Sequence, residues 1–447
     1  MTRRWKSLAW LLLSAGFAAH WAWSLQKTLP GGMVDLKAVY YASRSALSGQ
    51  NPYDQAVLSR VYAESGDTLP TDPKMRFAVH NAITLCVNLP TALMLMTPWA
   101  MLSWSTVHEV WFGVEVIGLV MSAWLILEMN PENGYWLGTL LASFLVANAE
   151  IFLATGNLAT VVIGASVIAV WCFEKEKVVW AGVCLLAVAL VLKPHDCGLI
   201  WLYLMLRGGA IRRRALKVLV LSLVLSLVSV VWISNKSPDW PGQLKCHLAQ
   251  TSARGDINDP GPRSLVDKGA GMIVSLQSVL SYFRDDPSFY SPATFLICGA
   301  MLLLWGSAML MRGGSEQLPM LAMGVVIPIS LLITYHRNYD AKILLLTIPA
   351  CEQLWSERGL LGKVAAGVNG VTFLLDGDLA ITAIFELEKK LRGAYGNVQS
   401  AVLKVLFDRP IAVALLMMAL FYLVVYLHRI GRWAATRDSM TKPAPAA

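Results

Sequence analysis

Hydrophobic positions along the chain gather in long runs that short polar connections separate. Most runs hold about 16 to 22 residues, close to the roughly 20 that a helix needs to cross the hydrocarbon of a bilayer. The runs cover residues 8–29, 84–102, 107–128, 136–155, 157–173, 178–193, 196–206, 216–234, 293–311, 318–334, 341–356, 362–376 and 410–428. This pattern predicts an all-α polytopic membrane protein, a bundle of about 11 to 13 transmembrane helices.

Three long polar segments interrupt the runs, at residues 30–83, 235–290 and 377–409. Arginine and lysine cluster instead in short connections such as Arg212–Arg214 and beside both termini, which places those parts in the cytoplasm by the positive-inside rule. We therefore expect a single transmembrane domain over residues 1–440, with the three long segments as outward-facing loops. We expect residues 441–447 to form a disordered cytoplasmic tail.

Two details of the topology stay open in the sequence. The first run, 8–29, favours an uncleaved helix over a signal peptide, because it is long for the apolar core of such a peptide. Counting crossings from the two ends of the chain gives opposite sides for Glu174–Lys177. One run between residues 84 and 173 therefore does not span, and we suspect the break at Thr155-Gly156-Asn157.

The composition excludes a soluble protein. Hydrophobic residues make up 56% of the 447 residues and charged residues 15%, against about 25% charged in soluble domains. The net charge of +8 lies at helix ends and forms no basic stripe, so we expect the bilayer as a partner and no nucleic acid. The seven cysteines are scattered without CxxC spacing and predict no disulfide framework.

Asp35 is the first candidate for chemistry. It follows the first apolar run almost directly, so it should lie at the membrane edge, where a partly desolvated carboxylate can act as a general base. The alternative is an N-cap for a helix beginning near Leu36. Spacing alone favours the cap.

A second candidate is the polar and aromatic segment Tyr335-His336-Arg337-Asn338-Tyr339-Asp340 between two apolar runs. Arg337 offers a forked donor to a phosphate, and His336 can donate or shuttle a proton. The alternative is an interfacial aromatic belt with one snorkelling arginine.

A third candidate is Lys193-Pro194-His195-Asp196, at the outward end of an apolar run. A lysine there either snorkels to the interface or meets a partner, and it would suit a lipid phosphate as counter-ion. Asp376-Gly377-Asp378 has the DxD form of some metal sites, but a helix end with glycine is the favoured interpretation. His20, His80, His108, His195, His247 and His428 show no metal-ligand spacing, so we expect no structural metal. No cofactor is firmly expected, and dependence on a divalent metal stays open.

These segments, taken in their order along the chain, resemble the GT-C superfamily of membrane glycosyltransferases, and most closely glycosyltransferase family 87. That family includes bacterial mannosyltransferases that use polyprenyl-phosphate mannose. The resemblance runs across most of the chain and rests on Tyr40-Tyr41-Ala42, Gly49-Gln50-Asn51-Pro52-Tyr53-Asp54, Leu89-Pro90-Thr91, Gly156-Asn157, Leu192-Lys193-Pro194, Ser275-Leu276-Gln277-Ser278-Val279-Leu280 and Tyr335–Asp340. Asn157 departs from the pattern, since glutamine is frequent there, and Pro90 stands alone where a pair is common.

The resemblance implies roles for individual residues. The first-loop acid of GT-C enzymes lies in an outward-facing active site, so Asp35 becomes the candidate catalytic base that deprotonates an acceptor hydroxyl. Candidates for binding the donor phosphate are Lys193, His336 and Arg337. Candidates for lining the sugar or acceptor pocket are Asn51, Tyr53, Tyr335 and Asp340.

We therefore predict an inverting transferase that moves a hexose, with mannose favoured, from a polyprenyl-phosphate donor to an envelope lipid or glycan. The reaction would take place on the outer, periplasmic face of the bacterial plasma membrane. A transporter or flippase of lipid-linked saccharides and a non-catalytic assembly subunit remain alternatives. A transporter predicts ionisable residues near the middle of helices, whereas Asp35, Lys193 and His336 stand at helix ends.

Overall fold

The computed structural model describes residues 3–28, 32–66, 71–129, 135–264, 272–311, 318–395 and 401–441. Within these ranges the chain forms helices and one isolated β-bridge, between Ile273 and Arg337. The first half contains α1 (Arg3–Thr28), α2 (Val34–Leu47), α3 (Gln55–Glu64), α4 (Pro73–Thr84), α5 (Pro90–Ala100), α6 (Trp104–Leu127), α7 (Tyr135–Ala147), α8 (Glu150–Thr155), α9 (Ala159–Glu174), α10 (Val179–Leu192) and α11 (Pro194–Leu206). The second half contains α12 (Gly209–Ser234), α13 (Trp240–Thr251), α14 (Leu276–Leu280), α15 (Pro287–Leu310), α17 (Pro319–Ile333), the 3₁₀ helix η1 (Asn338–Thr347), α18 (Ile348–Ser356), α19 (Leu360–Leu375), α20 (Asp378–Tyr395), α21 (Ala401–Asp408) and α22 (Pro410–Thr441).

Helix α17 forms the centre of the bundle. Every residue from 321 to 332 is buried, as expected for a helix that is apolar on all sides. It packs against α11, α15, α22 and η1. Its last residue leads directly into the segment that carries His336 and Arg337, so this segment starts from a fixed point inside the bundle.

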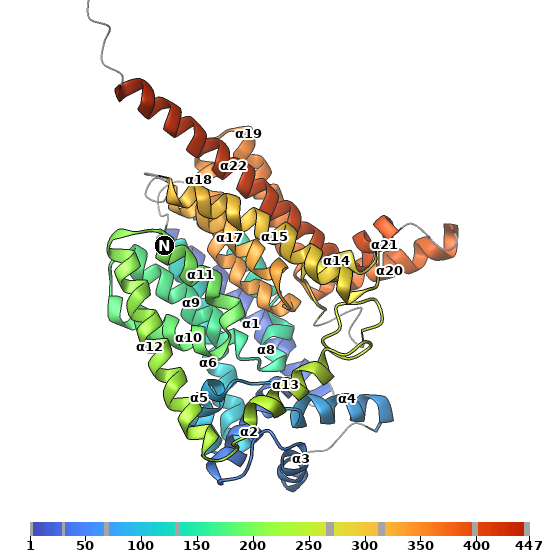
Figure 1. Ribbon diagram of the computed structural model, residues 1–447. Coiled ribbons are helices and arrows are strands. Elements are labelled where there is room, and N and C mark those ends of the chain that lie inside the picture. The colour runs from blue at the N-terminus through green and yellow to red at the C-terminus, as the bar shows by residue number, and fades with distance from the viewer. Residues whose placement is uncertain are drawn as a thin grey trace, which may run out of the picture.

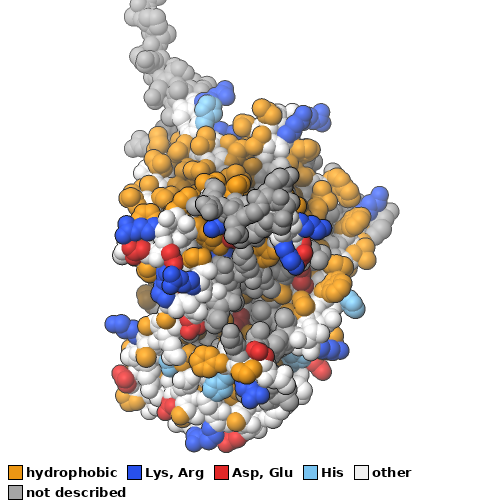
Figure 2. Space-filling model, turned by 90° about the vertical axis from the view of Figure 1, so that its right-hand side faces the viewer, with side chains coloured by type: hydrophobic (Ala, Val, Ile, Leu, Met, Phe, Trp, Pro, Cys, Tyr) orange, Lys and Arg blue, Asp and Glu red, His pale blue; other side chains and the backbone are white. Residues whose placement is uncertain are grey.

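The outer helices turn their apolar side chains away from the protein. Leu223 and Leu227 on α12 are 60% and 66% exposed, and Leu296 and Leu303 on α15 are 74% and 73% exposed. Figure 2 shows hydrophobic side chains gathered over the upper part of one face, while the lower end carries charged and polar groups. Such a surface suits lipid around the bundle and water at its end.

Several helices meet the requirements of a membrane span, which confirms the predicted all-α polytopic class. Within the described residues, five helices are long and apolar enough, and α19 with α20 adds a sixth if that bent pair is one span. Four shorter apolar helices, α7, α9, α10 and α17, belong to the same bundle. Local breaks therefore divide the apolar runs into long spans and shorter inner helices.

The three predicted loops contain helices of their own. Residues 30–83 include α2, α3 and α4, residues 235–290 include α13 and α14, and residues 377–409 include α20 and α21. Figure 1 shows α2, α3, α4 and α13 together at the lower end of the bundle, which we call the Asp35 end. The predicted tail begins at Thr441, the last residue of α22, and residues 442–447 lie outside the described part of the chain.

The opposite end of the bundle is marked by charged side chains, and we call it the Arg4 end. Arg4 pairs with Glu128 at 3.5 Å, and Lys175 donates to the Met129 carbonyl at 3.3 Å. These contacts place the Glu174–Lys177 turn at the end where the chain begins. Arg207 pairs with Glu174 at 2.6 Å, so the basic connection between α11 and α12 lies there too.

The run over residues 84–102 is the one that stays at the Asp35 end. The Tyr53 hydroxyl donates to the Asn88 carbonyl ahead of α5, and the Tyr40 hydroxyl donates to the Leu102 carbonyl behind it, both at 2.8 Å. Both ends of α5 are thus tied to residues of the first loop. The chain does break at Gly156, but our suspicion that this break marks the non-spanning run is wrong. Helix α5 has 11 residues, too few to cross.

Candidate active site

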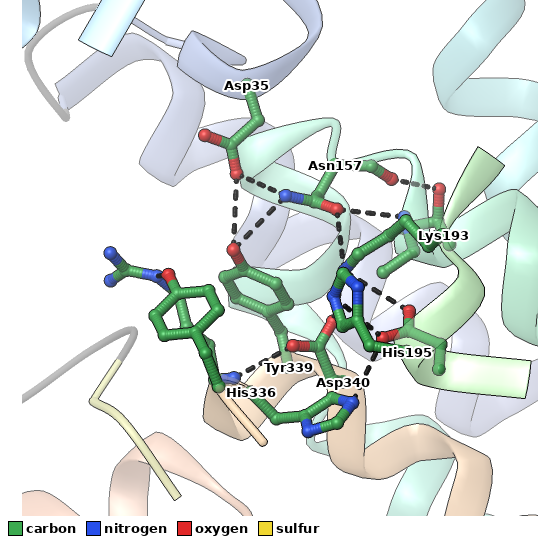
Figure 3. Close-up of polar contacts among 12 residues, drawn as sticks. Asp35, Asn157, Lys193, His195, His336, Tyr339 and Asp340 are labelled. Carbon is green, nitrogen blue, oxygen red and sulfur yellow. Dashed lines mark hydrogen bonds and ion pairs between the residues drawn. The ribbon is translucent and has the colours of Figure 1, made fainter. Parts of the chain in front are cut away.

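Asp35 is the second residue of α2, and its side chain faces the turn between α8 and α9. Its Oδ2 atom accepts a hydrogen bond from Asn157 Nδ2 at 2.8 Å and another from the Tyr339 hydroxyl at 3.4 Å. Among the described residues none donates to Oδ1, which Figure 3 shows pointing away from both partners. The N-cap of α2 is Met33, and it makes no side-chain cap. The interpretation of Asp35 as a helix cap is therefore wrong.

Gly156 and Asn157 form the turn that provides this partner. Gly156 has a φ of 64°, which favours glycine, and a Cβ atom there would lie 2.9 Å from Leu36 Cβ. The missing Cβ lets α2 pack against the turn. Asn157 Oδ1 accepts from the Ala159 N–H at 2.8 Å, so the amide nitrogen is the atom that faces Asp35.

Lys193 lies between α10 and α11 and joins this pair to a second set of acidic groups. Its Nζ is 2.9 Å from Asp340 Oδ1, 3.2 Å from Asp196 Oδ2 and 3.5 Å from Asn157 Oδ1. Burial alone would lower the pKa of a lysine, but the neighbouring carboxylates outweigh burial and raise the pKa of Lys193. The ammonium group therefore stays charged, and it faces two carboxylates.

The segment after α17 is held against the second outer loop. The Val274 N–H donates to the His336 carbonyl at 2.9 Å, and the Asn338 N–H donates to the Met272 carbonyl at 3.0 Å. Asp340 Oδ2 accepts from the Arg337 N–H at 2.8 Å. Asp340 thus fixes the start of η1 with one oxygen and binds Lys193 with the other.

The Arg337 side chain points toward the outer loop and stays largely buried. Its guanidinium donates to the Ile257 carbonyl and to Asn258 Oδ1, each at 3.0 Å, and also contacts the Tyr335 hydroxyl. Asp35 is among the groups that raise the pKa of Arg337 against the effect of burial, which acts in the opposite direction. Arg337 therefore adds positive charge near Asp35 while it anchors the loop.

A cluster of two histidines and one aspartate lies on the other side of Lys193. His195 Nε2 is 3.3 Å and His336 Nε2 is 3.2 Å from Asp196 Oδ1. These atoms all lie within 4.8 Å of one another, a spacing that could hold a metal ion. Burial lowers the pKa of His195, so its imidazole is neutral, the form that binds metals.

Asn51 and Tyr53 lie farther along the first loop and have other partners. Asn51 Nδ2 donates to Gln243 Oε1 on α13 at 3.0 Å, and Asn51 Oδ1 accepts from the Tyr53 N–H at 2.9 Å. The Tyr53 hydroxyl reaches Asn88, as described above. These contacts attach the loop to α13 and α5. Their role in a sugar pocket stays a prediction.

Four members of the network had no role predicted from the sequence: Asn157, His195, Asp196 and Tyr339. His195, Asp196 and Tyr339 stand in segments that carried a candidate, and Asn157 stands in a segment that carried only the family resemblance. Packing alone shows which of these side chains meet. The available signal was a polar residue directly after a break in an apolar run, as at Asn157. Asp196 likewise begins the apolar part of α11. In Figure 3 the network continues from Asp35 through Asn157 and Lys193 to His195 and His336.

A comparison with protein families identifies the chain. The model of glycosyltransferase family 87 matches residues 87–335, more than half of the chain. The chain belongs to glycosyltransferase family 87. It is a membrane glycosyltransferase, and its place in the GT-C superfamily is consistent with this match. The same comparisons find no match among curated proteins or among solved structures.

The family 87 match includes Asn157, Lys193 and Asp196, whereas Asp35 precedes it and His336 and Asp340 follow it. The fold brings Asp35, His336 and Asp340, which lie outside the matched range, into contact with residues inside it. Asn157 and Tyr339 bind one Asp35 oxygen, and Lys193 binds Asp340. The family 87 segment and its flanks thus form one connected polar network.

Proposed function

We propose that this family 87 enzyme transfers a hexose from a polyprenyl-phosphate donor to an envelope lipid or glycan, with inversion at the sugar carbon. Mannose is the sugar we favour. The Asp35 end is assigned to the outer face of the bacterial plasma membrane, because basic residues mark the Arg4 end. A donor held in the bilayer reaches a site among helices from the side, and no nucleotide-binding domain is required.

The orientation of Asp35 carries the proposal. A general base must be fixed in place and must keep one oxygen available for the proton that it accepts. Asn157 and Tyr339 bind Oδ2, and the described residues leave Oδ1 open. We assign Oδ1 to the acceptor hydroxyl. A single displacement with one base inverts the sugar carbon, and the lipid phosphate departs as an anion.

The departing phosphate needs positive charge nearby, which Lys193, His336 and Arg337 are proposed to supply. Lys193 and Arg337 approach the Asp35 network from two sides, as their contacts with Asn157 and Tyr335 indicate. Asn51, Tyr53, Tyr335 and Asp340 stay the candidates for the sugar and acceptor pocket. Of these, Tyr335 and Asp340 are on the segment that also carries His336.

Sugar transfer by the purified enzyme tests the proposal. The assay uses wild type and Asp35→Asn in nanodiscs, with radiolabelled polyprenyl-phosphate mannose as donor and a membrane-lipid extract as acceptor. We expect labelled product from the wild type and at least a 1,000-fold slower rate from the variant, about the upper range of losses on removing a general base. Glu64→Gln, an exposed carboxyl on α3, is the matched control and should transfer at the wild-type rate.

The stability of each variant is measured alongside the transfer rate. Asp35→Asn should unfold at the wild-type temperature, because asparagine keeps the shape of the side chain. A folded Asp35→Asn enzyme that transfers mannose at the wild-type rate would exclude Asp35 as the base. Transfer from a different polyprenyl-phosphate sugar, with the same dependence on Asp35, would correct the sugar and retain the mechanism.

A further inference from the structure

Two imidazole nitrogens and one carboxylate oxygen converge beside Lys193. Both Nε2 atoms, from His195 and His336, approach the same Oδ1 atom of Asp196, at 3.3 Å and 3.2 Å. The Asp196 and His336 side chains are 2% and 0% exposed, and that of His195 is 35% exposed. Three ligand atoms are therefore gathered at one point that is accessible from the His195 side.

The contacts on the two sides of the His336 ring make this position informative. Its Nδ1 lies 3.3 Å from the Thr334 carbonyl oxygen and 3.5 Å from the Thr334 hydroxyl. The shorter contact is to a carbonyl, which can only accept a hydrogen bond, and it favours the ring form with the proton on Nδ1. In that form Nε2 presents a lone pair to Asp196 Oδ1. Two lone pairs at 3.2 Å repel one another unless a cation or a second proton lies between them. Neither His336 Nε2 nor the Asp196 oxygens have a hydrogen-bond partner of acceptable geometry among the described residues.

We propose that His195, Asp196 and His336 bind a divalent transition-metal ion, and that Zn²⁺ fits best. Zinc bonds of about 2.0–2.2 Å at tetrahedral angles put neighbouring ligand atoms about 3.3 Å apart, as both nitrogens are from Asp196 Oδ1. Two histidines and one carboxylate form a three-ligand zinc site with an open fourth position. Imidazole nitrogen also disfavours Mg²⁺ and Ca²⁺, which select oxygen ligands.

The surrounding groups support an ion at this position. Lys193 forms an ion pair with Asp196 Oδ2 at 3.2 Å, which leaves Oδ1 for the metal. The Thr334 carbonyl oxygen orients the His336 ring in the same way. Such outer contacts are typical of metal-binding histidines and carboxylates.

The ion would also change the net charge beside the proposed site of the donor phosphate. Lys193 faces both Asp196 and Asp340, so the two carboxylates offset much of the positive charge that Lys193 offers to a phosphate. A divalent ion gives this group of side chains a net positive charge. Its open position can then bind the donor phosphate, and His336 contacts the phosphate through the metal. This role rests on the proposed function, whereas binding of the ion does not.

Zinc binding by the full-length protein in detergent is the first test. The protein is stripped with a chelator, dialysed against Zn²⁺ and assayed for metal content, and Co²⁺ serves as an optical probe of the ligands. We expect about one zinc per chain and the visible absorption of four- or five-coordinate cobalt. Since even the loss of an outer contact weakens metal sites 10–100-fold, removal of the ligand in His195→Ala should weaken binding by at least about 100-fold.

The choice of variants makes the result decisive. His195 is partly exposed and not a core residue, so His195→Ala should remain folded where Asp196→Asn or His336→Ala does not. His20→Ala changes an exposed histidine on α1 and should bind zinc as the wild type does. Equal zinc binding by wild type and His195→Ala would overturn the site and leave a proton-linked His–Asp network in its place.

A second measurement separates the metal site from the proposed reaction. Addition of a short-chain polyprenyl phosphate should change the cobalt spectrum if the phosphate takes the open position, and chelation should reduce mannose transfer by at least 10-fold. Zinc binding without any transfer would retain the site and reject the proposed reaction. Full transfer by the metal-free enzyme would retain the reaction and overturn the role of the ion.

Discussion

At the scale of single residues, Asn157 decides how the candidate base is presented. Its Oδ1 is occupied by the Ala159 N–H and by Lys193, so its Nδ2 binds Asp35. Tyr339 reaches the same Asp35 oxygen at 3.4 Å, a longer and weaker contact than the 2.8 Å bond from Asn157. The two partners should therefore contribute unequally to activity.

Replacing these partners one at a time tests that order. Asn157→Ala removes a hydrogen bond to a charged group, worth about 1.5–3 kcal/mol, so we expect kcat/KM to fall roughly 10- to 150-fold. Tyr339→Phe should lower it less than about 5-fold, because the bond it removes is long. Asn235→Ala, at an exposed position after α12, is the control. A larger loss from Tyr339→Phe than from Asn157→Ala would contradict this geometry.

At the scale of elements, the conformation of the turn between α8 and α9 sets the position of the candidate base. Gly156 adopts a positive φ, and its missing Cβ leaves room for Leu36 on α2. The Met33 N–H donates to the Ala154 carbonyl on the other side of this contact. Asp35 and Asn157 meet because two helix ends approach closely here.

Gly156→Ala should disturb both stability and activity. A non-glycine residue in the left-handed region costs about 1–2 kcal/mol, and the added Cβ also pushes α2 away from the turn. We expect a lower unfolding temperature in detergent and at least a 10-fold loss of sugar transfer. Gly113→Ala in α6, where an added Cβ meets no atom within 4 Å, should keep both. If a destabilised Gly156→Ala enzyme transfers sugar at the wild-type rate, the turn does not set the geometry of the candidate site.

At the scale of the whole molecule, the contacts at the two ends set the path of the chain. Glu128 and Lys175 lie with the start of α1, while both ends of α5 are tied to the first loop. The chain therefore crosses the bundle in α6 and not in α5. With this change, the counts of crossings from the two termini agree on the side of Glu174–Lys177.

Cysteine labelling in intact cells tests this path. Cys184 and Cys246, the two exposed cysteines, are first replaced by alanine, and Glu64→Cys, Ser103→Cys or Glu176→Cys is then introduced. A membrane-impermeant maleimide should label positions 64 and 103 from outside and position 176 only after the membrane is opened. If position 103 instead behaves like position 176, α5 crosses the membrane and the assigned path is wrong.

The sequence by itself determined the class of the protein and most of the segments that form the site. Apolar runs specify membrane helices because lipid solvation and backbone hydrogen bonding within a helix are local properties. Polar residues that interrupt such runs are costly, so Asp35, Lys193 and the Tyr335–Asp340 segment stood out without a structure. The family resemblance was found from the order of these same segments.

Only the tertiary structure decided which of these side chains meet. Asp35 and Asn157 are separated by 122 positions, and Lys193 and Asp340 by 147. The spacing of these residues in the sequence therefore did not indicate either contact. It also did not indicate that His195 and His336 both contact Asp196. The path of α5 was hidden for the same reason, since an 11-residue apolar helix looks like part of a span until its ends are located. Packing places these groups, and packing depends on the whole chain at once.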